Sequence, residues 1–303
     1  MTKTLISVVG ATAIGKTALS IKLAQHFQTE IISCDSRQFF KEMQLGTAVP
    51  SDEELHAAPH HFIQHVSIFD SYNVGQFERD AIAKLDALFE KHNIVIMVGG
   101  SGLYVDAVVK GLDEFPKVDS NIRTQLNAQL AKEGIASLQQ QLKVLDPVYY
   151  ERVALENPHR LIRALEICIG SGKPYSSFLK DTSASRSFKT IKVGLTADRE
   201  IVYDRINRRV DMMMQEGLLE EAKVLHPHKT LNALQTVGYR ELFEYLDGNW
   251  TLEFAVSEIK KNTRRFAKRQ GTWFRRDEHT LWFDYEEDIN TIIEKVDTLL
   301  LNR

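Results

Sequence analysis

A glycine-rich loop near the amino terminus constrains the fold of this chain more than any other feature. Residues 10–17 read Gly-Ala-Thr-Ala-Ile-Gly-Lys-Thr, a complete match to the pattern G-x-x-x-x-G-K-[ST]. The loop follows the apolar run 4–9 and precedes a helical pattern over 16–27, which is the context that the motif requires. Backbone N–H groups in such a loop converge at a helix start, where the helix dipole also favours a phosphate. The sequence therefore predicts a site for a di- or triphosphate.

Two side chains of this loop carry further chemistry. Lys16 is expected to contact the terminal phosphates, and the hydroxyl of Thr17 is expected to help hold Mg²⁺. The motif alone leaves open which phosphorylated compound is bound and which reaction follows. The predicted phosphate-binding residues are Gly10, Ala11, Thr12, Ala13, Ile14, Gly15, Lys16 and Thr17.

Composition and cysteine usage indicate a cytoplasmic protein. The chain has 303 residues, a length sufficient for about two domains. Its composition, 43% hydrophobic and 26% charged with a net charge of −3, is ordinary for a globular protein. Cys34 and Cys168 lie far apart without metal-type spacing, so a reducing compartment fits better than a disulfide scaffold. The apolar stretch at the amino terminus belongs to the phosphate loop, so we expect no secretion signal. No apolar run reaches membrane-spanning length, and no membrane association is expected.

Continuous apolar runs alternate with helical patterns in the first hundred residues. The runs cover 4–9, 30–34 and 94–98, with a helical pattern over 76–91, and a further run follows at 190–195. Strands that are apolar on both faces belong to a parallel sheet covered by helices. Ligands of such sheets bind beyond the carboxyl ends of the strands. We therefore predict an α/β fold with a P-loop NTPase-like core, a parallel sheet flanked by helices.

Residues 118–187 have a different character, because strand-like runs disappear and helical segments follow one another. These segments are 120–132, 135–142 and 158–169. The Gly-Ser-Gly-Lys at 170–173 follows a helix instead of a strand, so we interpret it as a helix stop and not as a second phosphate loop. The pattern predicts an all-helical insertion domain at 118–187 within an α/β core formed by 1–117 and 188–303.

Asp35 is the first candidate for catalysis. It ends the second apolar run, so its carboxylate is expected to point into the cleft near the bound phosphate. A carboxylate in that position could take a proton from an incoming nucleophile, although a turn or helix-cap residue is the alternative. The third run ends in Gly99-Gly100 rather than an acidic residue. The usual NTPase carboxylate is therefore missing, which disfavours a simple ATPase.

The segment 260–276 is strongly basic although the chain as a whole is slightly acidic. It holds eight basic residues and no acidic one. On a helix, Phe266 and Trp273 can lie opposite a cationic stripe made of Lys261, Arg264, Arg265, Lys268 and Arg269. The pattern predicts a helix docked by its aromatic face that presents this stripe to a polyanion. A solvated charged face would need acidic partners, so nucleic acid is favoured.

A second basic cluster and a group of histidines leave alternatives open. Arg205 and Arg209 fall one turn apart on a predicted helix and could clamp a diphosphate. They could equally pair with their neighbours Asp204 and Asp211, and spacing alone does not decide between the two. Four histidines at 56–65 flank a proline in an apparent loop. Because no carboxylate or cysteine completes a ligand set there, a metal site is not favoured.

Taken together, these features resemble the tRNA dimethylallyltransferase family, also called the tRNA isopentenyltransferase or IPP transferase family. The resemblance runs in order along nearly the whole chain, which makes it far more specific than the phosphate loop alone. The matching segments are 10–17, 35–38, 46–50, 58–61, 99–104, 157–166, 172–174, 205–211, 237–240 and 268–275. The family usually has Pro, Lys and Thr where this chain has Ala11, Val49 and Ser101.

The resemblance implies transfer of a dimethylallyl group from dimethylallyl diphosphate to N6 of the adenosine 3′-adjacent to the anticodon in tRNA. The products are N6-(dimethylallyl)adenosine and diphosphate. It implies that the loop holds the diphosphate of the donor with Mg²⁺, in place of a nucleotide. Asp35 would accept the N6 proton, and Lys16 and Arg209 would neutralise the leaving diphosphate. We expect a monomer that binds the anticodon stem-loop.

The resemblance also implies a set of tRNA contacts. They are Asp35, Ser36, Arg37, Gln38, Ser101, Arg123, His159, Arg160, Leu161, Ile162, Arg163, Gln235, Thr236, Val237, Gly238, Tyr239, Arg240, Lys268, Arg269, Gln270, Gly271, Thr272, Trp273, Phe274 and Arg275. A P-loop kinase of a small metabolite or nucleoside is the main alternative, because the loop, Asp35 and an arginine lid would serve it equally. A small substrate, however, gives no reason for the basic segment 260–276. An RNA-binding switch without catalysis is the third possibility.

Overall fold

The computed structural model describes residues 2–179 and 185–301. Its chain divides into two compact units, one made of Met1–Lys110 with Ser185–Arg303 and the other of Gly111–Ala184. The sequence analysis places the boundaries of the second unit at 118 and 187. Each unit has its own buried apolar cluster.

A parallel sheet of six strands forms the centre of the first unit. Its order is β3-β2-β4-β1-β5-β6, and every pair of neighbours is parallel. The strands are β1 (Thr4–Gly10), β2 (Ile31–Ser33), β3 (His60–His61), β4 (Ile94–Val98), β5 (Lys189–Thr196) and β6 (Leu281–Asp284). All seven residues of β1 are buried, which explains why its sequence is apolar without alternation. The α/β fold predicted from the sequence is confirmed.

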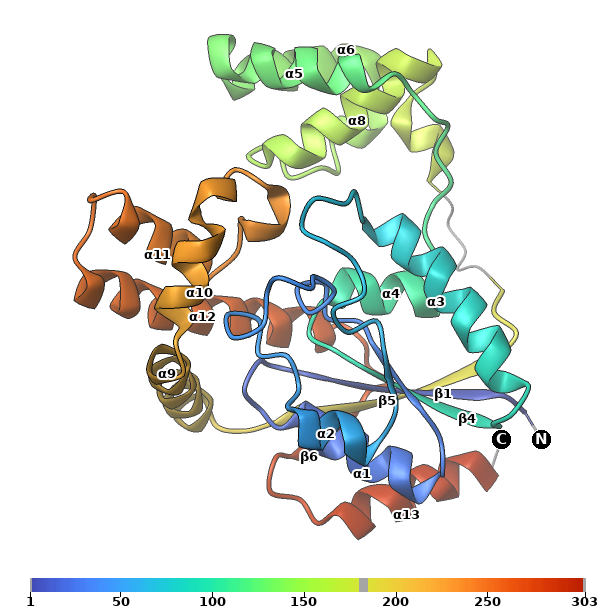
Figure 1. Cartoon of the computed structure of the whole chain (residues 1–303). Coiled ribbons are helices and arrows are strands. Elements are labelled where there is room, and N and C mark those ends of the chain that lie inside the picture. Colours follow the sequence, from blue (N-terminus) through green and yellow to red (C-terminus); the bar gives the residue numbers. More distant parts are fainter. Residues whose placement is uncertain (1, 180–184, 302–303) are drawn as a thin grey trace. The chain divides into compact units, whose positions relative to one another are not determined.

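Helices cover both faces of this sheet (Figure 1). On one face, α1 (Lys16–His26) and α13 (Ile289–Leu301) pack against Ile6, Val8 and Ile96. On the other face, α3 (Val74–Phe89) and α4 (Gly102–Lys110) pack against Leu5, Val95 and Met97. Alternate residues of the central strands thus serve opposite layers, because successive strand side chains point to opposite faces. The short α2 (Asp52–Ala57) begins with a capping box between Ser51 and Glu54.

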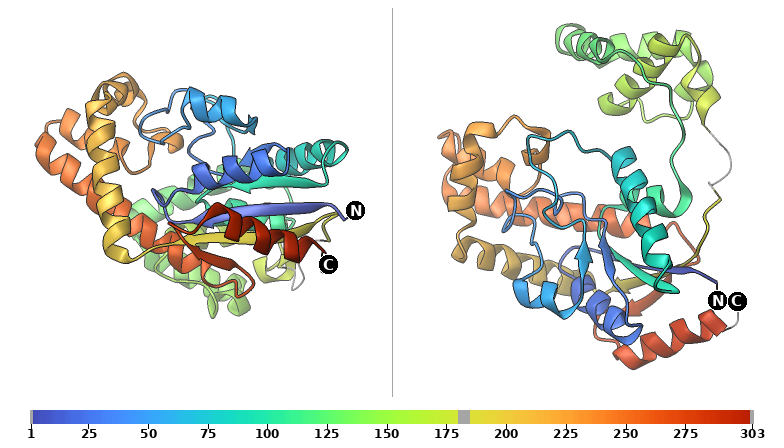
Figure 2. Two further views of the ribbon diagram at one scale, coloured as in Figure 1. Left: turned by 90° about the horizontal axis from the view of Figure 1, so that it is seen from below. Right: turned by 45° about the vertical axis from the view of Figure 1, so that its right-hand side comes forward.

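The carboxyl-terminal helices pack around a third apolar cluster that includes Met43, Leu218, Leu234 and Tyr239. They are α9 (Arg199–Gln215), α10 (Leu218–Leu225), α11 (Tyr239–Leu246) and α12 (Leu252–Phe274), with the 3-10 turns η2 (His226–His228) and η3 (Asn232–Leu234). In Figure 2, α9 in gold and α12 in orange-red lie side by side. The first strand begins and the last helix ends at the same edge of this unit.

The basic segment lies on a helix, α12, as predicted. Of the two aromatic residues expected on its docked face, one is packed against the protein and the other is exposed. Trp273 is half-buried and its Nε1 donates to Asp106 Oδ2 at 3.0 Å. Phe266, however, is 38% exposed, with the Arg269 guanidinium 5.7 Å from its ring centroid. The buried face instead runs through Ala255, Ile259, Ala267, Gln270 and Phe274. Phe266 shares this side of the helix, seven residues after Ile259, but it remains exposed, so helical spacing alone does not decide which part of the face is covered.

In the described part of the second unit, all regular structure is helical. Its elements are α5 (Ser120–Glu133), α6 (Ile135–Leu145), α7 (Pro147–Tyr150), α8 (Pro158–Ser171) and the 3-10 turn η1 (Tyr175–Phe178). Leu126, Leu138 and Leu161 lie in its core. Gly172 ends α8 with a φ of 69°, so the predicted helix stop is confirmed. The linker residue Phe115 stacks on Tyr175 with 4.7 Å between ring centroids, which explains why the unit begins before residue 118.

A buried carboxylate joins two helices of this unit. Glu166 on α8 is 6% exposed and accepts hydrogen bonds from Arg123 of α5 at 2.7 and 3.2 Å and from Arg163 at 3.0 Å. Burial alone would raise the pKa of Glu166, but the bonds from the two guanidinium groups outweigh it and hold the pKa below its ordinary value. A carboxylate with a lowered pKa stabilises the fold above its unfolded-state pKa and loses that contribution as the pH falls.

We therefore expect the insertion unit to lose stability as the pH drops through the range below about 4.5. Glu166→Gln should lower the free energy of unfolding by about 1–3 kcal/mol at pH 7 and flatten this acid dependence. Amide hydrogen exchange of α5 and α8, measured in the full chain from pH 7 to about pH 3, reports the change locally. The exposed Glu151→Gln is the matched control. A wild-type pH dependence as flat as that of Glu166→Gln would contradict this role for Glu166.

Candidate active site

A cavity of about 420 Å³ lies beyond the carboxyl ends of β1, β2 and β4. Its walls come from the loop after β1, from residues that follow β2 and β4, and from one face of α9. Lys16, Asp35 and Arg209, the three residues predicted to carry the chemistry, all line it. Open parallel sheets bind ligands at this edge, because the loops after successive strands meet there.

The loop at 10–17 has the backbone geometry of a phosphate site. Gly10 has a φ of 146° and Gly15 a φ of 109°, both in the region that favours glycine. A Cβ on Gly10 would also lie 2.8 Å from the carbonyl oxygen of Leu195. Lys16 Nζ donates to the carbonyl oxygen of Ala11 at 2.7 Å, which holds the ammonium across the loop.

The electrostatics of this loop favour negative charge. Burial lowers the pKa of Lys16 to about 8; the carboxylate of Asp35 opposes this shift and the Arg209 guanidinium adds to it. Burial likewise lowers the pKa of Arg209, again opposed by Asp35. Two half-buried cations therefore lie near one carboxylate. A bound phosphate would stabilise their charged forms, since an opposite charge at close range favours ionisation.

Two arginines of α9 face the loop. Arg205 Nε donates to the carbonyl oxygen of Ala13 at 2.7 Å, and Arg209 Nη1 donates to Thr12 Oγ1 at 3.4 Å. The acidic neighbours have other partners: Asp204 pairs with Arg208 at 2.7 Å, and Asp211 with Lys260 at 2.6 Å. Of the two alternatives that the spacing left open, the structure therefore supports the clamp on the phosphate loop.

Asp35 follows β2 and lines the same cavity. Its Oδ1 accepts a hydrogen bond from the N–H of Arg37 at 3.2 Å. Asp35 therefore forms the local turn contact considered from the sequence and also lines the cavity. The N–H of Ser36 donates to Ser101 Oγ at 3.2 Å, which ties this segment to the loop after β4. A Cβ on Gly99 would lie 3.0 Å from the backbone nitrogen of Asp35, so only glycine allows this close approach.

Gln38 is held by a second loop, and that loop is held by a glutamate. Gln38 Nε2 donates to the carbonyl oxygen of Ala48 at 2.8 Å. The preceding N–H groups of residues 44–46 all donate to the carboxylate of Glu221, at 2.8 to 3.2 Å. Glu221 also accepts the hydroxyl of the buried Tyr239 at 2.6 Å. Glu221 on α10 thereby fixes the 44–48 loop that positions Gln38.

The basic side chains of α12 divide into paired and outward-facing ones. Lys260 and Lys261 have acidic partners, Asp211 at 2.6 Å and Glu258 at 2.8 Å, so the expectation that the segment lacks such partners is wrong for these two. Arg265, Lys268 and Arg269 are exposed, and no ion pair of theirs occurs within the described residues. The free part of the stripe is thus shorter than predicted and lies toward the carboxyl end of the helix.

The residues implied to contact tRNA fall into three classes of burial. Exposed are Arg123, His159, Arg160, Gln235, Arg240, Lys268, Arg269, Thr272 and Arg275. Half-buried are Asp35, Ser36, Arg37, Gln38, Ser101, Arg163, Thr236, Val237, Gly271 and Trp273. Buried are Leu161, Ile162, Gly238, Tyr239, Gln270 and Phe274. The side chains of the last class pack inside their own units, so direct contact with RNA is open to the first two classes.

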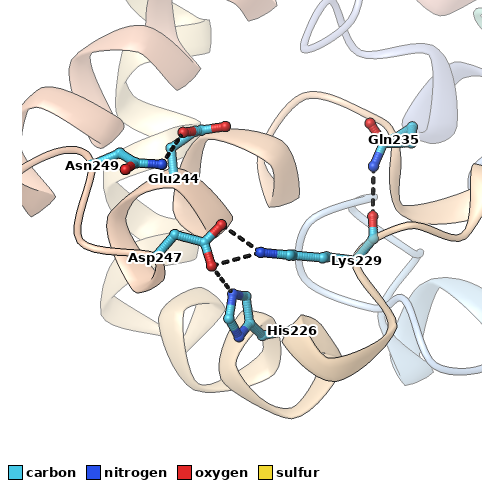
Figure 3. A network of polar contacts seen from close by, with 6 residues as sticks. All are labelled: His226, Lys229, Gln235, Glu244, Asp247 and Asn249. Carbon is cyan, nitrogen blue, oxygen red and sulfur yellow. Dashed lines mark hydrogen bonds and ion pairs between the residues drawn. The ribbon is translucent and has the colours of Figure 1, made fainter.

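One exposed member, Gln235, is held by the network of Figure 3. Gln235 Nε2 donates to the carbonyl oxygen of Lys229, whose Nζ donates to both oxygens of Asp247 at 2.6 Å. His226 Nε2 lies 2.9 Å from Oδ1 of the same carboxylate. Asp247 thereby joins the end of α11 to the 226–235 segment. Hydrogen bonds from Lys229 and His226 lower the pKa of Asp247.

The cavity also contains Glu54, Ile63 and Met212, which sequence patterns gave no reason to single out, and one of the four histidines, His60. Glu54 carries a charge that acts on Arg209, yet its only local signal is the capping box of α2. No group of three or more His, Cys, Asp or Glu side chains in the described residues could hold a metal ion. Among those residues no helix is long and apolar enough to cross a membrane.

Comparisons with known proteins agree on one family. A family model described as IPP transferase matches residues 38–277. A tRNA dimethylallyltransferase of Flavobacterium johnsoniae is 62% identical over 300 residues, 97% of each chain. One from Christiangramia forsetii is 61% identical over 298 residues, covering 98% of this chain and 99% of the relative.

Solved structures give the same result. A tRNA isopentenylpyrophosphate transferase from Bacillus halodurans has a TM-score of 0.73 at 36% identity, covering 99% of this chain and 96% of the other. A eukaryotic dimethylallyltransferase, described in crystallographic snapshots as acting on tRNA, has a TM-score of 0.86 at 25% identity, with 99% and 80% covered. By its sequence and by its fold, this chain belongs to the IPP transferase family.

Proposed function

We propose that this enzyme transfers the dimethylallyl group of dimethylallyl diphosphate to N6 of the adenosine 3′-adjacent to the anticodon in tRNA. The observation that carries the proposal is the cavity in which a phosphate loop and two cations face a carboxylate, Asp35. The loop and the cations suit a diphosphate leaving group, and the carboxylate suits an acceptor that must lose a proton. The curated relatives named tRNA dimethylallyltransferase support the same reaction.

Departure of diphosphate from the allylic carbon is the step that the loop assists. The C1–O bond of the donor breaks, its electron pair leaves with the diphosphate, and the allylic carbon gains cationic character. Negative charge grows on the leaving oxygen, where backbone N–H groups, Lys16 and Arg209 can stabilise it. These groups are held in place before the reaction, Lys16 by Ala11 and Arg209 by Thr12, so little reorganisation is needed.

Attack by the adenine amine completes the transfer. An exocyclic aromatic amine is a poor nucleophile, so bond formation from N6 to C1 depends on the cationic carbon. The proton that N6 loses goes to the carboxylate of Asp35, which lines the cavity together with the phosphate loop. The target adenine must leave its stack to reach the cavity, which costs a few kcal/mol. Bases of an anticodon loop are already single-stranded, which reduces this cost.

Magnesium fits the site as a partner of the diphosphate. The hydroxyl of Thr17 lines the cavity and is a hard oxygen ligand, and Mg²⁺ is commonly bound by one or two protein oxygens together with substrate phosphates and water. When bound, Mg²⁺ would supply further positive charge to the leaving diphosphate. Thr17 would supply a protein oxygen to the ion, and the other ligands would come from the substrate phosphates and water.

The exposed cations of α12, Arg265, Lys268 and Arg269, offer a surface for tRNA phosphates. On the insertion unit, the exposed His159 and Arg160 offer another. All groups that the mechanism needs come from one chain, which supports action as a monomer. An enzyme that modifies tRNA would act in the cytoplasm, where its substrate is found. A kinase of a small metabolite is not favoured, because it would not need the α12 surface and because the relatives are named as tRNA-modifying enzymes.

Removing the proposed proton acceptor should separate catalysis from binding. We expect Asp35→Asn to lower kcat by about 10²- to 10⁴-fold, while the Kd for the anticodon stem-loop changes little. Single-turnover transfer and fluorescence anisotropy measure the two quantities. The exposed Asp52→Asn, on the nearby α2, serves as control. Transfer by Asp35→Asn at the wild-type rate would rule out proton acceptance by this carboxylate.

Truncating a cation of α12 should change the salt dependence of tRNA binding. We expect Lys268→Ala and Arg269→Ala each to weaken binding and to reduce the slope of log K against log salt by about 1, because one phosphate contact is lost. Titrations at several salt concentrations give the slope. Lys295→Ala, an exposed lysine of α13, should leave it unchanged. Identical slopes in all four proteins would mean that neither Lys268 nor Arg269 contacts a phosphate.

Weakening the carboxylate that holds the 44–48 loop should impair the reaction from a distance. Glu221→Gln places an amide among three N–H donors and a hydroxyl, so one acceptor is lost and the loop is released. We expect kcat/KM for tRNA to fall about tenfold, with little change in the KM for the donor. Glu220→Gln, the exposed neighbour paired with Lys223, is the control. Equal activity of both variants would show that the loop does not depend on Glu221.

A further inference from the structure

A single buried side chain joins the basic helix to the phosphate loop. Gln270 on α12 is 5% exposed, and both ends of its amide are used. Its Oε1 accepts the N–H of Thr12 at 2.8 Å, and its Nε2 donates to the carbonyl oxygen of Gly100 at 2.9 Å. One of the backbone donors of the phosphate loop is therefore bound by the protein itself, which fixes how the remaining N–H groups face the cavity.

The second partner of Gln270 leads to the proposed proton acceptor. Gly100 belongs to the 99–102 loop after β4, and the next residue, Ser101, accepts the N–H of Ser36 at 3.2 Å. Ser36 directly follows Asp35. The amide of Gln270 thus lies between the segment that binds the diphosphate and the segment that carries the carboxylate. A shift of this one side chain would disturb both segments, since its amide bonds to Thr12 and to Gly100.

The packing around Gln270 leaves little freedom for such a shift. A Cβ on Gly100 would clash with Gln270 Nε2, and one on Gly102 would clash with the indole of Trp273. The helix therefore lies directly on the 99–102 loop along one full turn. Trp273 Nε1 adds a hydrogen bond to Asp106 Oδ2 at 3.0 Å. Because an α-helix is stiff over one turn, movement of its outer face is transmitted to this inner face.

The outer face of the same turn carries two of the cations proposed for tRNA. Lys268 and Arg269 are exposed, while Gln270, the next residue, points into the core. We propose that Gln270 is a positioning residue that couples tRNA binding on α12 to donor binding in the phosphate loop. The proposal rests on the function proposed above and deepens it: each ligand stabilises the arrangement of α12 and the loops that the other needs, which makes the coupling reciprocal.

The test compares the affinity of one ligand with and without the other. The probes are an unmodified anticodon stem-loop and inorganic diphosphate with Mg²⁺. In the wild-type enzyme, diphosphate should tighten stem-loop binding by about fivefold or more. Gln270→Met keeps the length of the side chain and removes both hydrogen bonds, so this factor should fall to about one, with the stem-loop Kd in the absence of diphosphate changed less than about twofold.

Kinetics and a control on the same helix add a readout that general destabilisation would not give. In Gln270→Met we expect kcat/KM for the donor to fall about tenfold. Thr263→Val alters a half-buried side chain of α12 that bonds only within the helix, to the carbonyl oxygen of Ile259. It should keep wild-type coupling at a similar melting temperature.

A second variant perturbs the contact from the other side. Gly100→Ala should push the amide of Gln270 away and thereby lower kcat/KM for the donor. In the double variant Gly100→Ala, Gln270→Met, kcat/KM for the donor should be no more than about twofold below that of the worse single variant. Full additivity, or coupling in Gln270→Met equal to that of the wild type, would overturn the proposal. The affinities are measured without turnover. Failure of the wild type to modify RNA would therefore count against the proposed function, and retained coupling in the variants against the role of Gln270.

Discussion

Backbone N–H groups between β1 and α1 converge on a small volume, and this concentration of positive partial charge is the constraint on which the rest of the site depends. It requires glycine at positions 10 and 15, where φ is positive. It also accounts for the neighbours, since Lys16 and Arg209 add full charges at the same place. Buried cations are costly unless an anion is near. Asp35 partly balances them, and a diphosphate would balance them fully.

Around this loop the protein adds long-range hydrogen bonds to the local ones. Gln270 reaches Thr12 across 258 positions of sequence, and Glu221 holds the 44–46 turn across 175 to 177 positions. Each of these side chains satisfies backbone N–H groups in loops that no helix or strand could hold. The loops that line the cavity therefore gain rigidity from helices that follow much later in the chain, and this arrangement positions the reacting groups without lengthening the strands.

Features with a local cause could be predicted from the sequence, and features with a distant cause could not. The phosphate loop and the apolar strands follow from residues that are adjacent in sequence, and so does Asp35 at a strand end. The two-residue β3 has too few residues for a pattern. Phe266 was expected on the docked face of its helix. Helical spacing shows which residues share a face, but it does not show whether a neighbouring segment covers them. The buried amide of Gln270 depends on loops elsewhere in the chain, so local spacing gave no sign of it.

The proposed reaction removes diphosphate from an allylic donor in this cavity while Asp35 receives the proton of an adenine amine. The most direct measurement is mass spectrometry of an unmodified anticodon stem-loop after incubation with the purified enzyme, Mg²⁺ and dimethylallyl diphosphate, with released diphosphate quantified in parallel. We expect one dimethylallyl group on the adenosine 3′ of the anticodon for each diphosphate released. An RNA of unchanged mass, or diphosphate released without modified RNA, would contradict it.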